Sequence, residues 1–335
     1  MQTKKGGRLK IAVQLSGNLR TFEECAPLLK HYLLDRYDSD IFIHTWDQLD
    51  HAEQTYLRGP TASLPTLPAA VKEKVVALYQ PKEVVFEPIE NIKKVEGFFR
   101  DQPLSAQSGV FSLQAVWNTM ITSVAANNLR KAYSKQQGLH YDFVIRTRPD
   151  IALLEPVIIE NFLPLFQFHH RSCVLFPGNY FIANGKQQYG EAHDYGFTFA
   201  GANDTFFICP ESVMDNIMDN LMDNFDSLYR DAPKLFPKNM ARYLDVETMF
   251  YYHIQRLGIM THFGRINKMI RRLDTSKDNL QLFQDRLENS RQHFVDGRPS
   301  LQLPPLSSST PPLSASSKTL VSPWSQAWLP VLEKK

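Results

Sequence analysis

The sequence has few cysteines, no excess of either charge and no long apolar run. Its three cysteines are widely spaced and include no C-x-x-C pair, which argues against a zinc or redox motif and against a disulfide framework. Lysine and arginine total 37 against 35 acidic residues, so the net charge of +2 gives no general case for nucleic-acid binding. No stretch reaches the roughly 20 apolar residues of a membrane span. We therefore expect a protein of a reducing compartment, with no nucleic-acid partner.

The remaining composition is typical of a soluble globular protein. Hydrophobic residues make up 43% of the 335 positions and charged residues 21%, so the chain can bury a substantial core. The basic N-terminal segment has an apolar run of only about five residues before Ser16, too short for the h-region of a signal peptide. We expect a cytoplasmic location.

Strands and helices alternate in the first half of the sequence. Short apolar runs alternate with segments whose apolar residues have helical spacing. This alternation favours a mainly parallel sheet with helices on both faces. The fold class is therefore α/β, with a Rossmann-like sheet flanked by helices. The predicted strands are 9–17, 39–46, 82–88 and a segment beginning at Tyr141, and the predicted helices include 68–79 and 110–134.

The second half is less regular and ends in a tail. Short strands are predicted at 173–178 and 204–210, and helices at 210–231 and 243–258. Residues 298–335 are rich in proline and serine and cannot bury enough apolar surface to become ordered, so we expect a disordered tail. Its last residues include two tryptophans near lysines, which suit either a peripheral membrane contact or docking on the protein's own body.

The turn after the first strand is a candidate anion site. It reads "QLSGNLRTF" and contains Gln14, Ser16, Gly17 and Arg20. Gly17 permits a tight turn, and the helix that begins near Thr21 offers N–H groups to an anion beside Arg20. The turn lacks both the G-x-G-x-x-G pattern and the lysine of a P-loop. A plain strand-to-helix turn is the alternative.

A second candidate follows the strand 39–46, where His44, Trp46 and Asp47 emerge. His44 can bind a ligand or titrate, and Trp46 can stack on a base or a sugar ring. A structural histidine within the packed layers is the alternative.

The third candidate is the end of the strand that begins at Tyr141, "RTRPD". Arg146, Arg148 and Asp150 alternate, which on a strand places them on one face, and Pro149 must end the ladder. Two arginines can offer bidentate donors to a diphosphate. Asp150 can ligate a divalent ion or hydrogen-bond a ribose. The alternative is a structural salt-bridge network.

Several later residues are candidates for acid–base chemistry. His193 and Asp194 belong to a segment rich in glycine and tyrosine, and Asp204 begins a predicted strand. Glu247 lies early in an otherwise apolar helix, where a carboxylate either caps a group or faces a cavity.

A regular repeat, "MDNIMDNLMDNFD", places Asp215, Asp219 and Asp223 four residues apart on one helix face. Carboxylates at this spacing repel one another unless they hold a metal. We interpret them as a solvated stripe opposite a methionine-rich core face.

Taken together, these motifs resemble bacterial glycosyltransferases that build lipopolysaccharide and capsule glycans. The resemblance covers roughly residues 9 to 265, and that family is of the GT-A type. It implies a nucleotide-sugar-binding half (8–155), an acceptor-side, catalytic half of the same domain (156–297) and the tail (298–335). The segments that carry it, in order, are "IAVQLSGNLRTF", "DIFIHTW", "YDFVIRTRPDIAL", "NDTFFICPESVMD" and "DVETMFYYHIQRLGI".

The resemblance implies a role for each candidate residue. Asp150 stands where GT-A enzymes place a D-x-D metal motif, but arginines occupy the neighbouring acidic positions, so both Mg²⁺ or Mn²⁺ and a metal-independent mechanism stay open. Asp204 and Glu247 would face the acceptor, and one of them would be the general base of an inverting transfer. The expected donor-binding residues are Gln14, Ser16, Gly17, Arg20, His44, Trp46, Arg146 and Arg148.

The function expected from the sequence is therefore the transfer of a sugar from a nucleotide-diphospho-sugar to a hydroxyl of a glycan or glycolipid acceptor at the cytoplasmic side of the membrane. A sulfotransferase that uses phosphoadenosine phosphosulfate is the second hypothesis, although "QLSGNLR" lacks the basic residue that normally precedes the glycine of its phosphosulfate loop. A catalytically inactive nucleotide-sugar-binding scaffold is the third.

Overall fold

The structure is a computed structural model. His193, Asp194 and the predicted tail 298–335 lie outside the residues that it describes. Of residues 179–183, 186–190 and 200–202 it describes the backbone alone. The described residues are 8–49, 66–88, 113–177, 179–183, 186–190, 200–202, 204–228, 246–264, 266–270 and 285.

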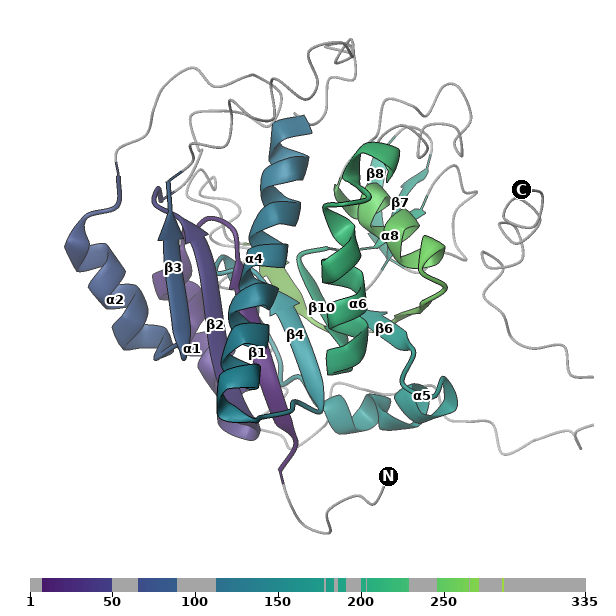
Figure 1. Cartoon of the computed structure of the whole chain (residues 1–335), viewed down its shortest axis with the longest axis horizontal. Helices are drawn as coiled ribbons and strands as arrows, with labels where there is room; N and C mark the ends of the chain where they lie inside the picture. Colours follow the sequence, from purple (N-terminus) through teal and green to yellow (C-terminus); the bar gives the residue numbers. More distant parts are fainter. Residues whose placement is uncertain are drawn as a thin grey trace, which may run out of the picture. The chain divides into compact units, whose positions relative to one another are not determined.

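A seven-stranded sheet runs through this part of the chain, with strand order β11-β6-β10-β4-β1-β2-β3 (Figure 1). Only β10 runs antiparallel to its neighbours in this sheet. The predicted α/β class with a mainly parallel sheet is confirmed. Its strands are β1 (Lys10–Ser16), β2 (Asp38–Trp46), β3 (Glu83–Glu87), β4 (Phe143–Thr147), β6 (Cys173–Phe176), β10 (Phe206–Cys209) and β11 (Met260–Phe263).

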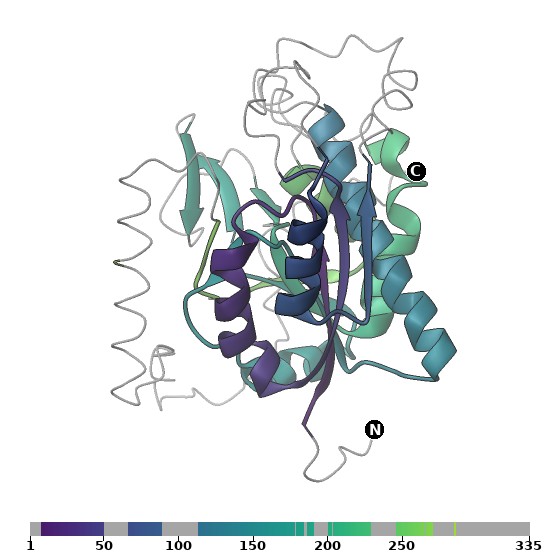
Figure 2. The ribbon, with the colours of Figure 1, turned by 90° about the vertical axis from the view of Figure 1, so that its left-hand side faces the viewer.

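Helices cover both faces of the sheet, as Figures 1 and 2 show. This covering explains why β1 and β4 are almost completely buried and read as continuous apolar runs. No described helix is long and apolar enough to cross a membrane. On one side lie α1 (Phe22–Tyr32) and α2 (Ala69–Tyr79), and on the other α4 (Leu113–Gln137), α6 (Glu211–Leu221) and α8 (Val246–Arg256).

Smaller elements complete the described fold. β5 (Ile151–Leu153) follows β4 almost at once and pairs antiparallel with β12 (Lys268–Ile270). This two-stranded sheet brings a late part of the chain next to the end of β4. The others are η1 (Leu34–Arg36), η2 (Ile159–Phe162), α5 (Leu163–Phe168), and the strands β7 (Asn179–Ala183), β8 (Lys186–Gly190) and β9 (Ala200–Ala202) of a three-stranded sheet.

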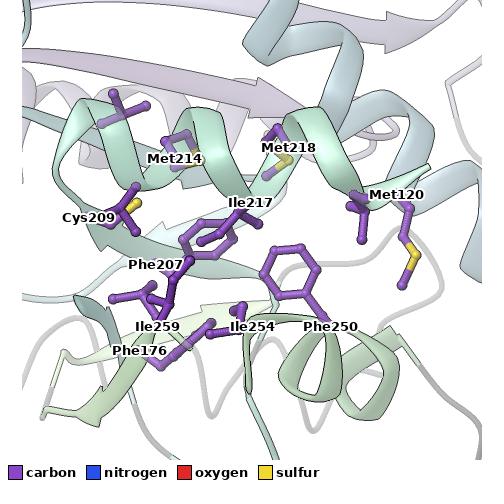
Figure 3. Packing of buried hydrophobic residues seen from close by; sticks show 14 of the residues in the cluster. Met120, Phe176, Phe207, Cys209, Met214, Ile217, Met218, Phe250, Ile254 and Ile259 are labelled. Atoms are coloured by element: carbon purple, nitrogen blue, oxygen red, sulfur yellow. The ribbon is translucent and has the colours of Figure 1, made fainter. Parts of the chain in front are cut away.

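The main core lies between the sheet and α6 and α8. Figure 3 shows Met214, Ile217 and Met218 of α6 directed toward Phe207 of β10 and Phe250 of α8. The spacing of three and four residues on α6 gives a single apolar face, as the methionine repeat predicted.

The aspartates of the repeat pair with α4. Asp215 accepts hydrogen bonds from Arg130 and Asn127, and Asp219 pairs with Lys131 at 2.6 Å. Asp223 follows the end of α6 at Leu221, residues 225–228 are again helical, and the predicted limit of 231 lies outside the described residues. The predicted solvated stripe is thus in part an ion-pair contact between two helices.

Arg130 carries most of this contact, because it is 1% exposed and also pairs with Glu211 at 2.5 Å. Arg130→Met should lower the free energy of unfolding by about 3 kcal/mol, since it leaves two carboxylates without their partner. Lys131→Met is the matched control and should cost less than about 1 kcal/mol, because its pair with Asp219 is exposed. Urea denaturation measures both, and equal losses would contradict this account.

Candidate functional site

Strand β4 ends at Thr147, and the residues after it form a turn in which the amide of Ile151 donates to the carbonyl oxygen of Arg148. Arg146, Arg148 and Asp150 therefore do not share one strand face, and that prediction was wrong. Pro149 stops the ladder as expected, but the chain then turns instead of continuing its alternation. Arg146 and Asp150 consequently meet different partners.

Asp150 is completely buried and binds two guanidinium groups. Its Oδ1 accepts from Nε of Arg148 at 2.9 Å, and its Oδ2 accepts from Nη2 of Arg148 at 2.5 Å and Nη1 of Arg20 at 2.7 Å. Burial pushes the pKa of Asp150 upward, but Arg148 and Arg20 outweigh it and hold the pKa below its usual value. The carboxylate is ionised and joins the turn after β1 to the turn after β4.

The turn after β1 contributes the Arg20 side chain to the ion pairs of Asp150. Gly17 (φ 106°) and Arg20 (φ 47°) both have positive φ angles, which aim the Arg20 side chain inward. The amide of Gly17 donates to the carbonyl of His44, and that of Arg20 to the carbonyl of Leu49. These two amides are therefore engaged within the protein, and the turn supplies the Arg20 guanidinium. Anion binding by the N–H groups of the helix that follows stays a prediction.

Arg146 lies inside the sheet layer and is 1% exposed. Its Nε donates to the Ser16 hydroxyl at 3.0 Å, and its Nη1 donates to the backbone carbonyl and the carboxylate of Asp204. Burial lowers the pKa of Arg146, and Asp204 opposes that shift. Asp204 sits in a turn two residues before β10 begins, not in the strand as predicted. We call Arg20, Arg146, Arg148, Asp150 and Asp204 the charged edge.

A cavity adjoins the charged edge on the side of α4 and α8. The space open to the centre of a water-sized sphere is only about 10 Å³, roughly enough for one water molecule, so a nucleotide sugar does not fit within it. Val246 and Phe250 of α8 line the cavity, but Glu247 is not among its lining residues, so the role of the Glu247 carboxylate stays a prediction. The lining residues are Thr119, Met120, Ser123, Arg146, Asp204, Phe207, Val246 and Phe250.

Lys268 on β12 is a member of this site that the sequence did not reveal. Its ammonium donates to the Thr205 hydroxyl at 2.6 Å and interacts electrostatically with Asp204, Asp150 and Glu247. The only signal in the sequence was a lysine beside the apolar residues of a short segment, "NKMI". The lysine thereby links the predicted residues Asp150, Asp204 and Glu247 electrostatically.

Three predicted donor-binding residues lie inside the packed layers. Gln14 donates from Nε2 to Asn127 at 2.7 Å, and His44 Nε2 lies 2.8 Å from Glu87. Trp46 is 2% exposed, with its ring edge-on to His44. Burial lowers the pKa of His44 although Glu87 opposes it. Their roles in donor binding stay predictions.

The residues around Asp150 do not fit a divalent cation. Both carboxylate oxygens accept hydrogen bonds from guanidinium groups, and Lys268 adds a further positive charge. Among the described residues, no group of three or more histidine, cysteine, aspartate or glutamate side chains is placed to hold a metal. The donor set suits an anion held by cations.

Comparisons with known proteins give distant structural similarities. No protein-family model and no curated protein sequence matches. The chain is similar to core-mannan synthase A from Aspergillus fumigatus in its Mn/GDP form, with 10% identity and a TM-score of 0.38 over 80% of this chain and 76% of that one. It is also similar to the apo form of mouse xyloside xylosyltransferase 1, with 12% identity and a TM-score of 0.37 over 77% and 84%. At these values neither similarity assigns an activity to this chain.

The pair of Arg146 and Asp204 should be strongly coupled energetically. Arg146→Met should cost about 3–5 kcal/mol of unfolding free energy, because it leaves a buried carboxylate unpaired. Adding Asp204→Asn should recover part of that loss, with a coupling energy of about 1–3 kcal/mol in a double-mutant cycle. The control cycle uses the exposed pair Lys30 and Asp35, where coupling should stay below about 1 kcal/mol. Additive effects at Arg146 and Asp204 would refute the coupling.

Proposed function

We propose that this protein is a glycosyltransferase that moves a sugar from a nucleotide-diphospho-sugar to a hydroxyl of a cell-surface glycan, of the lipopolysaccharide or capsule kind. The observation that supports it is the charged edge at the carboxyl ends of β1 and β4. Ligands of open α/β sheets bind beyond the carboxyl ends of their strands. The edge carries three arginines, and Lys268 lies beside it.

The cations match the chemistry of the leaving group. When the bond between the sugar carbon and the phosphate oxygen breaks, a nucleoside diphosphate leaves with an additional negative charge. Guanidinium groups that are already oriented stabilise that charge without reorganising. Arg148 is held in place by Asp150, and it is the most exposed arginine of the charged edge, with 14% of its side chain accessible. It therefore presents the guanidinium to the diphosphate.

Asp204 and Glu247 are the candidate bases. A new bond forms between the acceptor oxygen and the sugar carbon, and the acceptor hydroxyl gives its proton to one of these carboxylates. Asp204 lines the cavity and also pairs with Arg146. Glu247 lies in the first turn of α8 and interacts electrostatically with Lys268.

The acceptor and the location rest on the motif resemblance. We propose a glycan or glycolipid acceptor on the cytoplasmic face of the membrane, with residues 318–335 making a peripheral membrane contact. These residues lie outside the described part of the chain.

A panel of nucleotide-diphospho-sugars, with released nucleotide read by mass spectrometry, tests the function and the metal requirement together. We expect release from at least one donor, and we expect it to persist in EDTA, because Asp150 is occupied by guanidinium groups. Loss of release in EDTA with recovery in Mn²⁺ would contradict the metal-independent account. Turnover of phosphoadenosine phosphosulfate alone would identify a sulfotransferase, and donor binding without release or hydrolysis would identify a scaffold.

Arg148→Ala tests the role of the guanidinium in the chemical step. We expect kcat to fall about 100- to 1000-fold, because one oriented cation is lost at the leaving group. Lys131→Met is the control and should leave kcat unchanged, because Lys131 pairs with Asp219 and is not part of the charged edge. Circular dichroism would check that both variants are folded. Full activity of a folded Arg148→Ala variant would refute the assignment.

A further inference from the structure

Lys268 reaches the charged edge by the pairing of two short strands. β12 lies antiparallel to β5, the strand that begins directly after Asp150, with Lys268 opposite Leu153. The backbone is held further by the amide of Leu154, which donates to the carbonyl of Asn267. The position of the lysine is therefore set by main-chain hydrogen bonds, which is the rigid support that a binding residue needs.

Lys268 lies among charges of both signs. Its ammonium donates to the Thr205 hydroxyl, and Asp204, Asp150 and Glu247 attract it electrostatically. Lys268 also lies close enough to Arg148 for the like charges to oppose each other. Burial is the largest influence, and it lowers the pKa of Lys268 to about 8 in spite of the attraction of Asp204, Asp150 and Glu247. An anion that contacts both Lys268 and Arg148 would relieve their repulsion and compensate the burial.

We propose that Lys268 is a diphosphate-binding residue that acts together with Arg148. A diphosphate carries charge on two phosphoryl groups, and it suits one planar fork and one compact ammonium group at neighbouring positions. Lys268 binds the leaving group and takes no part in bond making or proton transfer. The identity of the ligand as a nucleoside diphosphate rests on the proposed function. The existence of an anion site rests on the position and contacts of Lys268.

The test measures binding of inorganic pyrophosphate and inorganic phosphate to the full chain by isothermal titration calorimetry in EDTA. Lys268→Met keeps most of the apolar stem and removes the ammonium. The affinity for pyrophosphate should therefore fall by about tenfold or more, as expected for one lost charge-assisted hydrogen bond. The affinity for phosphate should fall less than the affinity for pyrophosphate, because a single phosphate group makes poorer simultaneous contact with Lys268 and Arg148. Lys268→Arg keeps the charge and should restore affinity to within about threefold of the wild type. Lys131→Met is the control and should match the wild type.

Thr205→Val distinguishes binding from a structural role. It removes the hydroxyl partner and leaves the lysine, so pyrophosphate affinity should stay within about threefold of the wild type. The inference is overturned if Lys268→Met binds pyrophosphate as tightly as the wild type, if Thr205→Val loses as much as Lys268→Met, or if the wild type binds no pyrophosphate. Lys268-dependent binding in a chain that turns over no nucleotide sugar would support the anion site and refute the proposed function, so the two failures are distinguishable.

Discussion

The buried carboxylate of Asp150 organises the carboxyl edge of the sheet. It holds Arg148 through two hydrogen bonds and Arg20 through one, and so ties the turn after β1 to the turn after β4. An isolated carboxylate at this depth would be very costly, and each arginine would lose its orientation without it. The same interaction therefore stabilises the edge and places two guanidinium groups at the position where open α/β sheets bind ligands.

The other charged residues of the site lie on both sides of Asp150. Arg146 connects Ser16 of β1 to Asp204 before β10, and the small β5–β12 sheet brings Lys268 beside them. The antiparallel strand β10 matters here, because its amino end lies next to the carboxyl end of β4, with Phe206 opposite Thr147. One reversed strand thus brings a second carboxylate, Asp204, to the edge that already holds Asp150.

Most of the sheet could be predicted from the sequence because its strands are short apolar runs whose limits lie within about two residues of those found, but β11 was not predicted. The charged edge was predicted in part: Arg146, Arg148 and Asp150 were recognised, but strand alternation wrongly put them on one face, since Pro149 starts a turn. The pairing of Arg20 with Asp150 depends on positive φ angles at Gly17 and Arg20, and no sequence pattern predicts the angle at Arg20. Lys268 depends on pairing between strands far apart in sequence, and the burial of Gln14 and Trp46 depends on how α4 and β3 cover them.

The central claim is that the charged edge receives a diphosphate. A crystal structure of the full chain with the nucleoside diphosphate that the transfer assay releases tests it most directly. The account predicts phosphate oxygens within hydrogen-bonding distance of Arg148 and Lys268, beyond the carboxyl ends of β1 and β4. A diphosphate bound elsewhere on the chain, with neither side chain in contact with it, would contradict the account.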